Sequence, residues 1–465
     1  MRQRFIQSFP TSEDIQTALD NKELGKPYVA LSREEPSIDW NSKEINYAGM
    51  YFTIEALEDG NLAVSKSCQY SINGGEWISI ASSATIAVSN GDEVRFKDDL
   101  KTDKKYMFSG NTIMSNVYGN IMSLMYGDNF VGQTTALSTQ GLFRQYTGLK
   151  DAGNLILPTT LARYGYSKMF AGCTSLTTAP ELPATKLADD CYAEMFAGCT
   201  SLAQAPELPA TSLANYCYAS MFSGCTSLTT APELPARELA ERCYFEMFYG
   251  CTNLAEAPNL PATTLTPFCY CNMFQGCASL TQAPEIMATT LAIGCCYGMF
   301  QDCTSLTQSP ELPATNLADN CYIYMFQRCT SLATAPELPA TKLSNRCYSN
   351  MFAGCTSLIT APKLPATNLV NYCYDHMFWG CTSLTTAPEL PATSLADYCY
   401  NTMFYDCTNL NYIKCLATDI TATDCTGSWV SRVASTGTFI KHPDATWTTG
   451  TNGIPTGWTV VDAEI

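Results

Sequence analysis

Hydrophobic and polar positions along most of the chain follow a single period of 26 residues. The pair Met-Phe stands at Met169 and Phe170 and returns every 26 residues as far as Met403 and Phe404, which makes ten copies. A repeated unit of 20 to 50 residues is typical of a solenoid, in which each coil packs only on its two neighbours. The period therefore predicts that residues 169–415 form a stack of similar coils.

Each coil is expected to contain one short strand and one short helix. Leu187, Cys191 and Met195 fall at i, i+4 and i+8, which is the spacing of one buried helical stripe. The arc formed by residues 176–182 contains Pro180 and suits a short strand whose ladder is incomplete, since proline has no amide proton. The pattern predicts an α/β solenoid.

Cysteine is unusually frequent, with 24 residues, and it follows the same period. Nine cysteines form one column from Cys191 to Cys399, and ten form another from Cys173 to Cys407. One thiol per coil does not gather the closely spaced ligands of a zinc or iron–sulfur site, and a uniform column offers no natural disulfide pairing. We expect free, buried thiols that pack as small hydrophobes, with metal binding and disulfides between coils as the alternatives.

The flanking residues divide into four further segments. Residues 45–105 alternate apolar and polar positions around Asn-Gly turns, which predicts a small all-β, antiparallel sandwich-like domain. Residues 106–168 are expected to hold an N-terminal cap and degenerate first coils, and residues 416–465 a C-terminal cap. Residues 1–44 contain one predicted helix and are too short to form their own core. We therefore expect them to attach the chain to a larger assembly, with docking on the sandwich as the alternative.

Charge and composition exclude several classes of function. The formal net charge is −17, from 26 Lys and Arg against 43 Asp and Glu, which argues against a surface that binds nucleic acid. His376 and His442 are the only two imidazoles, so chemistry that depends on histidine is poorly supported. No stretch approaches the roughly 18 to 20 apolar residues of a bilayer span. We expect no nucleic acid, membrane insertion, metal or cofactor.

Binding residues on a solenoid are expected where its repeats differ. The variable columns place an aromatic cluster over the last coils, and exposed aromatic side chains can stack on sugars or anchor a protein interface. The alternative is that these side chains pack against the C-terminal cap. The candidate binding patch consists of Tyr372, His376, Trp379, Tyr398 and Tyr405.

A column of glutamates forms a second and weaker candidate. Calcium would require several oxygen ligands from one loop, whereas this column supplies one carboxylate per coil, so a solvated edge is the alternative. The solenoid as a whole has an excess of acidic over basic residues, which would favour solubility or a cationic partner. The column contains Glu181, Glu207, Glu233, Glu285, Glu311, Glu337 and Glu389.

The repeat resembles a known family. The units MFAGCTSLTTAPELPAT and LADDCYAEMF resemble the BspA-like leucine-rich repeat family over about residues 107–425. The resemblance implies coils that pair a leucine-bearing strand with a convex turn or helix, and a role in cell-surface adhesion and host or matrix binding. The flanks KPYVALSREEPSIDW and GIPTGWTV are similar to those of proteins carried by gut Bacteroidales and by their bacteriophages.

We therefore expect a non-enzymatic recognition protein that binds a host cell-surface glycan or protein. The start of the chain lacks the features of a signal peptide, which favours a bacteriophage virion protein, such as a tail fibre or capsid decoration, attached through residues 1–44. The alternatives are a Bacteroidales cell-surface adhesin, an architectural spacer without a ligand, and a glycan-degrading enzyme. The last needs two carboxylates that face each other, and no such pair stands off the repeat lattice. A homo-oligomer also stays open.

Overall fold

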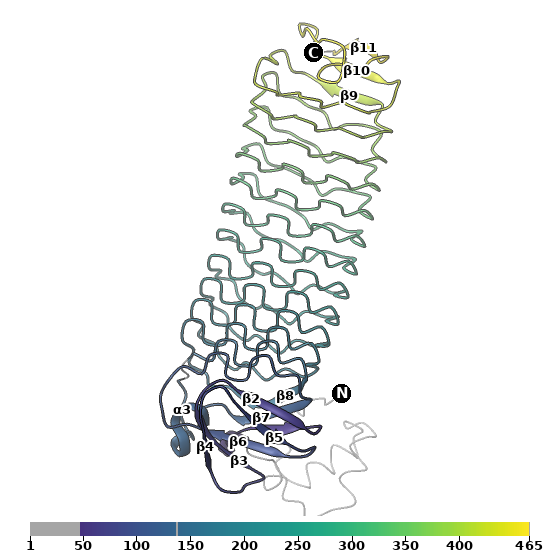
Figure 1. Cartoon of the computed structure of the whole chain (residues 1–465). Coiled ribbons are helices and arrows are strands. Elements are labelled where there is room, and N and C mark those ends of the chain that lie inside the picture. Colours follow the sequence, from purple (N-terminus) through teal and green to yellow (C-terminus); the bar gives the residue numbers. More distant parts are fainter. Residues whose placement is uncertain (1–46, 136–137, 465) are drawn as a thin grey trace, which may run out of the picture. The chain divides into compact units, whose positions relative to one another are not determined.

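The computed structural model describes residues 47–135 and 138–464, which begin with β-sheets, continue as a stack of coils and end in a small parallel sheet (Figure 1). The helix expected in residues 1–44 lies outside the described residues. The first elements are η2 (Tyr47–Gly49), β1 (Phe52–Ala56), β2 (Gly60–Val64), β3 (Cys68–Ile72), β4 (Ile78–Ile80), β5 (Ala84–Val88), β6 (Glu93–Lys97), β7 (Ser115–Asn120), α3 (Ser123–Tyr126), η3 (Gly127–Asn129) and β8 (Leu149–Ile156).

The N-terminal strands form a six-stranded sheet, in the order β4-β3-β6-β1-β7-β8, and a separate pair of β2 with β5. Both sheets send alternate apolar side chains, such as Phe52, Leu62 and Val94, into one buried core. Strand β7 pairs antiparallel with β1, and β8 pairs parallel with β7. The sheet therefore crosses the domain boundary expected at residue 105, because β8 connects it directly to the first coils.

Hydrogen bonds of the coils alternate between two directions. The amides of Tyr192 and Glu194 donate to carbonyl oxygens of the next coil at 3.0 and 2.8 Å, whereas the amides of Ala193 and Met195 close turns within their own coil. Every fourth residue has a positive φ, as at Asp190 (57°) and Glu194 (55°). An α-helix needs all of its amides for internal bonds and a negative φ throughout, so this arc is a run of turns.

The short helix expected in each coil is therefore wrong. Among residues 47–135 and 138–464, α3 is the only α-helix. The turns repeat every four residues, so they bury Cys191, Met195 and Cys199 side by side, and this spacing imitates a helical stripe. The expected strand is reduced to isolated parallel bridges, such as Thr360 with Thr386, because the neighbouring prolines cannot donate to a ladder.

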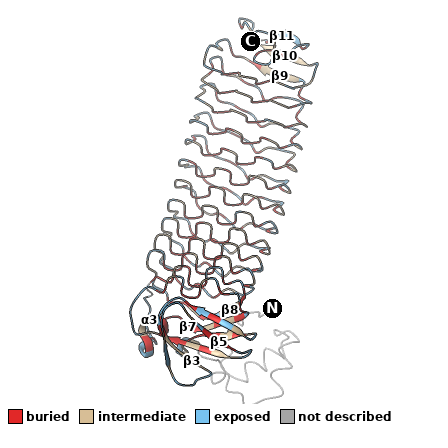
Figure 2. Cartoon of the chain, viewed as in Figure 1, coloured by how far each residue is buried: buried red, intermediate tan, exposed pale blue. Residues whose placement is uncertain are grey.

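The core of the stack consists of columns of identical side chains, and Figure 2 shows buried residues along the successive coils. The Phe, Met and Cys columns and the leucine column that contains Leu176 are almost completely buried. Most of the leucine column that contains Leu187 is only partly buried. Rings of successive coils stack nearly parallel, with Phe196 and Phe222 at 5.6 Å and Tyr192 and Tyr218 at 5.8 Å between centroids. Each coil therefore covers the apolar surface of the next, and no coil has a complete core alone.

All 24 cysteines are free and buried. In the column that begins at Cys173, each later thiol reaches back to the preceding coil, as where Cys199 Sγ donates to the carbonyl oxygen of Phe170 at 3.1 Å. The same oxygen accepts the amide of Cys173 at 3.0 Å. Cysteine thus combines a small apolar volume with a weak donor that joins neighbouring coils.

Thiol counting tests this arrangement. The folded protein is expected to react with Ellman's reagent at close to none of its 24 thiols, because the sulfurs are buried and burial raises the pKa of Cys191 to about 12. The chain unfolded without reductant should react at all 24. A count far below 24 in the unfolded, unreduced chain would show that disulfides are present.

The last coil is closed by a three-stranded parallel sheet of β9 (Tyr412–Cys415), β10 (Thr438–Lys441) and β11 (Thr459–Asp462). Trp429 is fully buried and lies against Tyr400 and Phe404, at 6.2 and 6.1 Å between ring centroids. Its indole nitrogen donates to the carbonyl oxygen of Gly453 at 2.8 Å. One tryptophan therefore covers the ends of both aromatic columns.

Candidate functional site

The positive-φ residues form three columns on the coils, spaced four residues apart in each coil. The third column consists mainly of glycine, as at Gly198, and the first two form ridges on the surface. Side chains along these ridges vary from coil to coil and are mostly half-buried or exposed. The first ridge consists of Tyr164, Asp190, Tyr216, Arg242, Phe268, Gly294, Asn320, Arg346, Tyr372 and Tyr398. The second ridge consists of Lys168, Glu194, Ser220, Glu246, Asn272, Gly298, Tyr324, Asn350, His376 and Thr402.

Bulky residues on the ridges are costly to the backbone. The left-handed conformation costs an ordinary residue about 1–2 kcal/mol, and glycine or asparagine adopts it more easily. Six large aromatic side chains nevertheless occupy ridge positions with φ between 54° and 60°, namely Tyr164, Tyr216, Phe268, Tyr324, Tyr372 and Tyr398. Since folding would favour smaller residues there, the aromatic side chains point to a role for the surface that they form.

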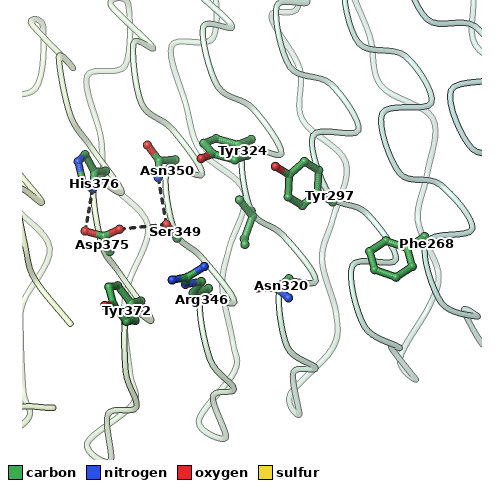
Figure 3. A pocket seen from close by; sticks show the side chains of 11 residues that line it. Phe268, Tyr297, Asn320, Tyr324, Arg346, Ser349, Asn350, Tyr372, Asp375 and His376 are labelled. Carbon is green, nitrogen blue, oxygen red and sulfur yellow. Dashed lines mark hydrogen bonds and ion pairs between the residues drawn. The ribbon is translucent and has the colours of Figure 1, made fainter. Parts of the chain in front are cut away.

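A pocket of about 460 Å³ lies across both ridges and spans five successive coils, with Phe268 at one end and Tyr372 and His376 at the other (Figure 3). Its volume is in the range of sites for small ligands. Its wall combines aromatic rings, amides and a few charged groups. The lining residues are Phe268, Tyr297, Asn320, Ile323, Tyr324, Arg346, Ser349, Asn350, Tyr372, Asp375 and His376.

The coil of residues 291–300 departs from the repeat and shapes this pocket. Gly294 and Gly298 leave both ridges without a side chain at this coil. A Cβ atom at Gly294 would lie 2.4 Å from the ring of Phe268, so the missing side chain leaves space for that ring. Cys296 occupies the position of the column tyrosine, and Tyr297 follows it as a half-exposed phenol that lines the pocket.

A chain of polar contacts holds the opposite end of the pocket (Figure 3). Asp375 contacts His376 Nδ1 at 2.7 Å and accepts a hydrogen bond from Ser349 Oγ at 3.4 Å. Asn350 Nδ2 donates to the same hydroxyl at 3.0 Å. The contacts fix the imidazole and one amide at the rim, and they leave the carbonyl oxygen of Asn350 for a ligand.

Of the predicted aromatic patch, the structure brings Tyr372 and His376 into the pocket. Tyr398 stacks on Tyr372 with 4.6 Å between ring centroids, and Asp424 and that neighbouring tyrosine raise the pKa of Tyr398. Trp379 is 42% exposed and meets the edge of His376 at 6.4 Å. Tyr405 is half-buried and does not line the pocket.

The prediction from the repeat columns did not include Phe268, Tyr297 and Arg346 in the candidate binding patch. Their signal was the coil of residues 291–300, where two ridge glycines and a displaced tyrosine occur together. Each of these substitutions is unremarkable when its own column is considered alone, and the site becomes evident only when the neighbouring columns of this coil are compared together.

The glutamate column remains at the surface, and all seven side chains are exposed. Glu389 forms an ion pair with Lys414 at 2.7 Å. Glu207 and Glu233 line a shallow hollow of about 250 Å³ between proline residues. Nowhere in the described part of the chain do three His, Cys, Asp or Glu side chains come together so that they could hold a metal ion.

Comparison with known proteins identifies the family. The model of the BspA type leucine rich repeat region matches residues 143–281 and 319–424, in six copies. The chain therefore belongs to this family, and the resemblance seen in its repeats is confirmed. The match omits residues 282–318, which include the coil that shapes the pocket.

Among solved structures, the chain is similar to a leucine rich cell surface protein from Faecalibacterium prausnitzii A2-165. The two share 16% sequence identity with a TM-score of 0.27, over 64% of this chain and 83% of that chain. A comparison with curated proteins gives no match. Within residues 47–135 and 138–464, no helix has the length and hydropathy of a membrane span.

Proposed function

We propose that this protein is a non-enzymatic recognition protein whose pocket, between Phe268 and His376, binds a glycan or protein on a host cell surface. The observation that carries the proposal is the position of the pocket, which forms where the chain departs from its repeat and where aromatic rings occupy costly backbone positions. Membership of a leucine-rich-repeat family supports it, because solenoids offer extended binding surfaces. The flanking sequences, which are similar to those of proteins of gut Bacteroidales and of their bacteriophages, support a place on a bacteriophage virion or, as the alternative, on a bacterial cell surface.

The contacts within the pocket favour binding over catalysis. Ser349, Asp375 and His376 have the composition of a catalytic triad, but the serine hydroxyl donates to the aspartate and not to the imidazole. A triad needs the imidazole to accept the serine proton. Asp375 is also the only carboxylate among the described lining residues, whereas glycoside hydrolysis generally needs two.

Replacing both Tyr297 and Tyr324 by alanine tests the proposed surface. The double variant of the full chain is expected to bind intact gut Bacteroidales cells at least about tenfold more weakly, because each lost aromatic anchor costs on the order of 1 kcal/mol or more. Flow cytometry with fluorescently labelled protein measures the change. Tyr249→Ala removes a ring that is 41% exposed and lies outside the pocket, and it should bind like the wild type. Undiminished binding by the double variant would contradict the proposal.

A further inference from the structure

We propose that the ligand of this pocket is an acidic carbohydrate, whose sugar ring packs on Tyr297 and Tyr324 and whose carboxylate pairs with Arg346. This inference rests on the proposed function and specifies its ligand. Three observations support it. Arg346 forms no ion pair with a carboxylate of the described chain, polar groups surround the rings of Tyr297 and Tyr324, and the charge of the surrounding chain is screened at a distance.

Arg346 is a cation held in place without a carboxylate partner. Its guanidinium lies over the ring of Tyr372 at 4.6 Å, and within the described parts of the chain no carboxylate forms an ion pair with it. Arg242 occupies the same ridge four coils earlier and pairs with Glu241 at 3.0 Å. Asn345 replaces that glutamate beside Arg346, so the guanidinium keeps its donors for a planar anion.

The aromatic and amide groups suit a sugar ring. Tyr297 and Tyr324 meet edge to face at 5.4 Å and 74°, so one ring can pack on an apolar sugar face while the other borders it. The amides of Asn320 and Asn350 line the same pocket and offer donors and acceptors for hydroxyl groups. Ile323 is the only aliphatic side chain among the described lining residues. A purely apolar ligand would leave these amides unpaired, which is costly.

The charges around the pocket allow it to distinguish acidic from neutral ligands through direct contacts. The whole chain carries −17, so distant carboxylates repel an anion, but this repulsion is screened beyond about 8 Å at physiological ionic strength. Asp375 lines the pocket and is already engaged by His376 and Ser349. Arg346 is therefore the group that distinguishes an acidic sugar from a neutral one.

Matched saccharides measured by calorimetry test the assignment with the full chain. The probes are 3′-sialyllactose against lactose, and trigalacturonic acid against its carboxyl-reduced form. At least one acidic probe should bind about tenfold or more tightly than its neutral partner. Arg346→Gln should remove this preference, because the acidic probes then lose their cationic partner and bind no more tightly than their neutral partners. Arg242→Gln removes the equivalent arginine outside the pocket and should preserve the preference.

The outcomes separate this inference from the proposed function. Equal binding of acidic and neutral probes, or an unchanged preference in Arg346→Gln, would overturn the acidic ligand. If cell binding still depends on Tyr297 and Tyr324 in that case, the proposed function stands. Loss of cell binding after protease treatment of the cells, with no saccharide bound, would assign a protein ligand instead. If neither saccharides nor cells depend on the pocket, both proposals fail.

Discussion

Raising the pH above about 9 will destabilise the folded repeats steeply. Burial raises the pKa of core thiols such as Cys191, Cys243 and Cys347 from 9.0 to about 12. The folded chain therefore holds these protons more tightly than the unfolded chain does. The stabilisation is complete below pH 9 and is lost as the pH rises from about 9 towards 12, by about 1.4 kcal/mol per pH unit for each such thiol.

Denaturant titrations in reducing buffer at pH 8, 9 and 10 measure this loss. The midpoint is expected to begin to fall between pH 8 and 9, where the thiols of the unfolded chain start to ionise, and to fall more steeply between pH 9 and 10. Cys191→Ala removes one titrating thiol, so its stability should decline less steeply by about 1.4 kcal/mol per pH unit. Equal midpoints for the wild type at pH 8 and pH 10 would show that the thiols are not buried as described.

Replacing Phe274 by alanine is expected to lower the free energy of unfolding by about 3–5 kcal/mol. Its fully buried ring stacks between Phe248 at 5.6 Å and Phe300 at 5.7 Å. The substitution opens a cavity inside a continuous column, so both neighbouring coils lose contacts. Denaturant unfolding followed by circular dichroism measures the change.

Gln275→Ala is the matched control, because this neighbouring residue is only partly buried and its loss should cost less than about 0.5 kcal/mol. Hydrogen exchange of Phe274→Ala should lose protection first in the adjoining coils, since each coil contacts only its neighbours. A decrease of less than about 1 kcal/mol in the free energy of unfolding would contradict the prediction that the phenylalanine column stabilises the stack.

Much of the fold could be predicted, because comparison of the ten copies within this one chain separates core positions from surface positions. Most apolar residues that return every 26 positions, such as Leu176, Met195 and Cys199, are buried. The local backbone could not be predicted, because turns with a four-residue period bury the same positions as a helix. The amide of Glu194 distinguishes the turns from a helix, because it donates to a carbonyl oxygen of the next coil. The spacing of residues within one coil does not reveal such a contact between coils.

The site was only partly predictable for a related reason. Tyr372 and His376 stand out as variable aromatic positions, and both line the pocket. Tyr297 was concealed because the buried column tyrosine of its coil is replaced by Cys296, so the phenol moves one residue along the chain and changes column. A one-residue shift in a turn exchanges an inward position for an outward one, which residue type alone does not reveal.

Photocrosslinking to intact cells tests the central claim, that the pocket contacts a cell-surface partner. A photoreactive phenylalanine takes the place of Tyr324 in one full-length chain and of Tyr249, outside the pocket, in another. Irradiation with gut Bacteroidales cells should give a crosslinked cell-surface product from position 324 and none from position 249. Equal crosslinking from both positions, or a product from position 249 alone, would contradict it.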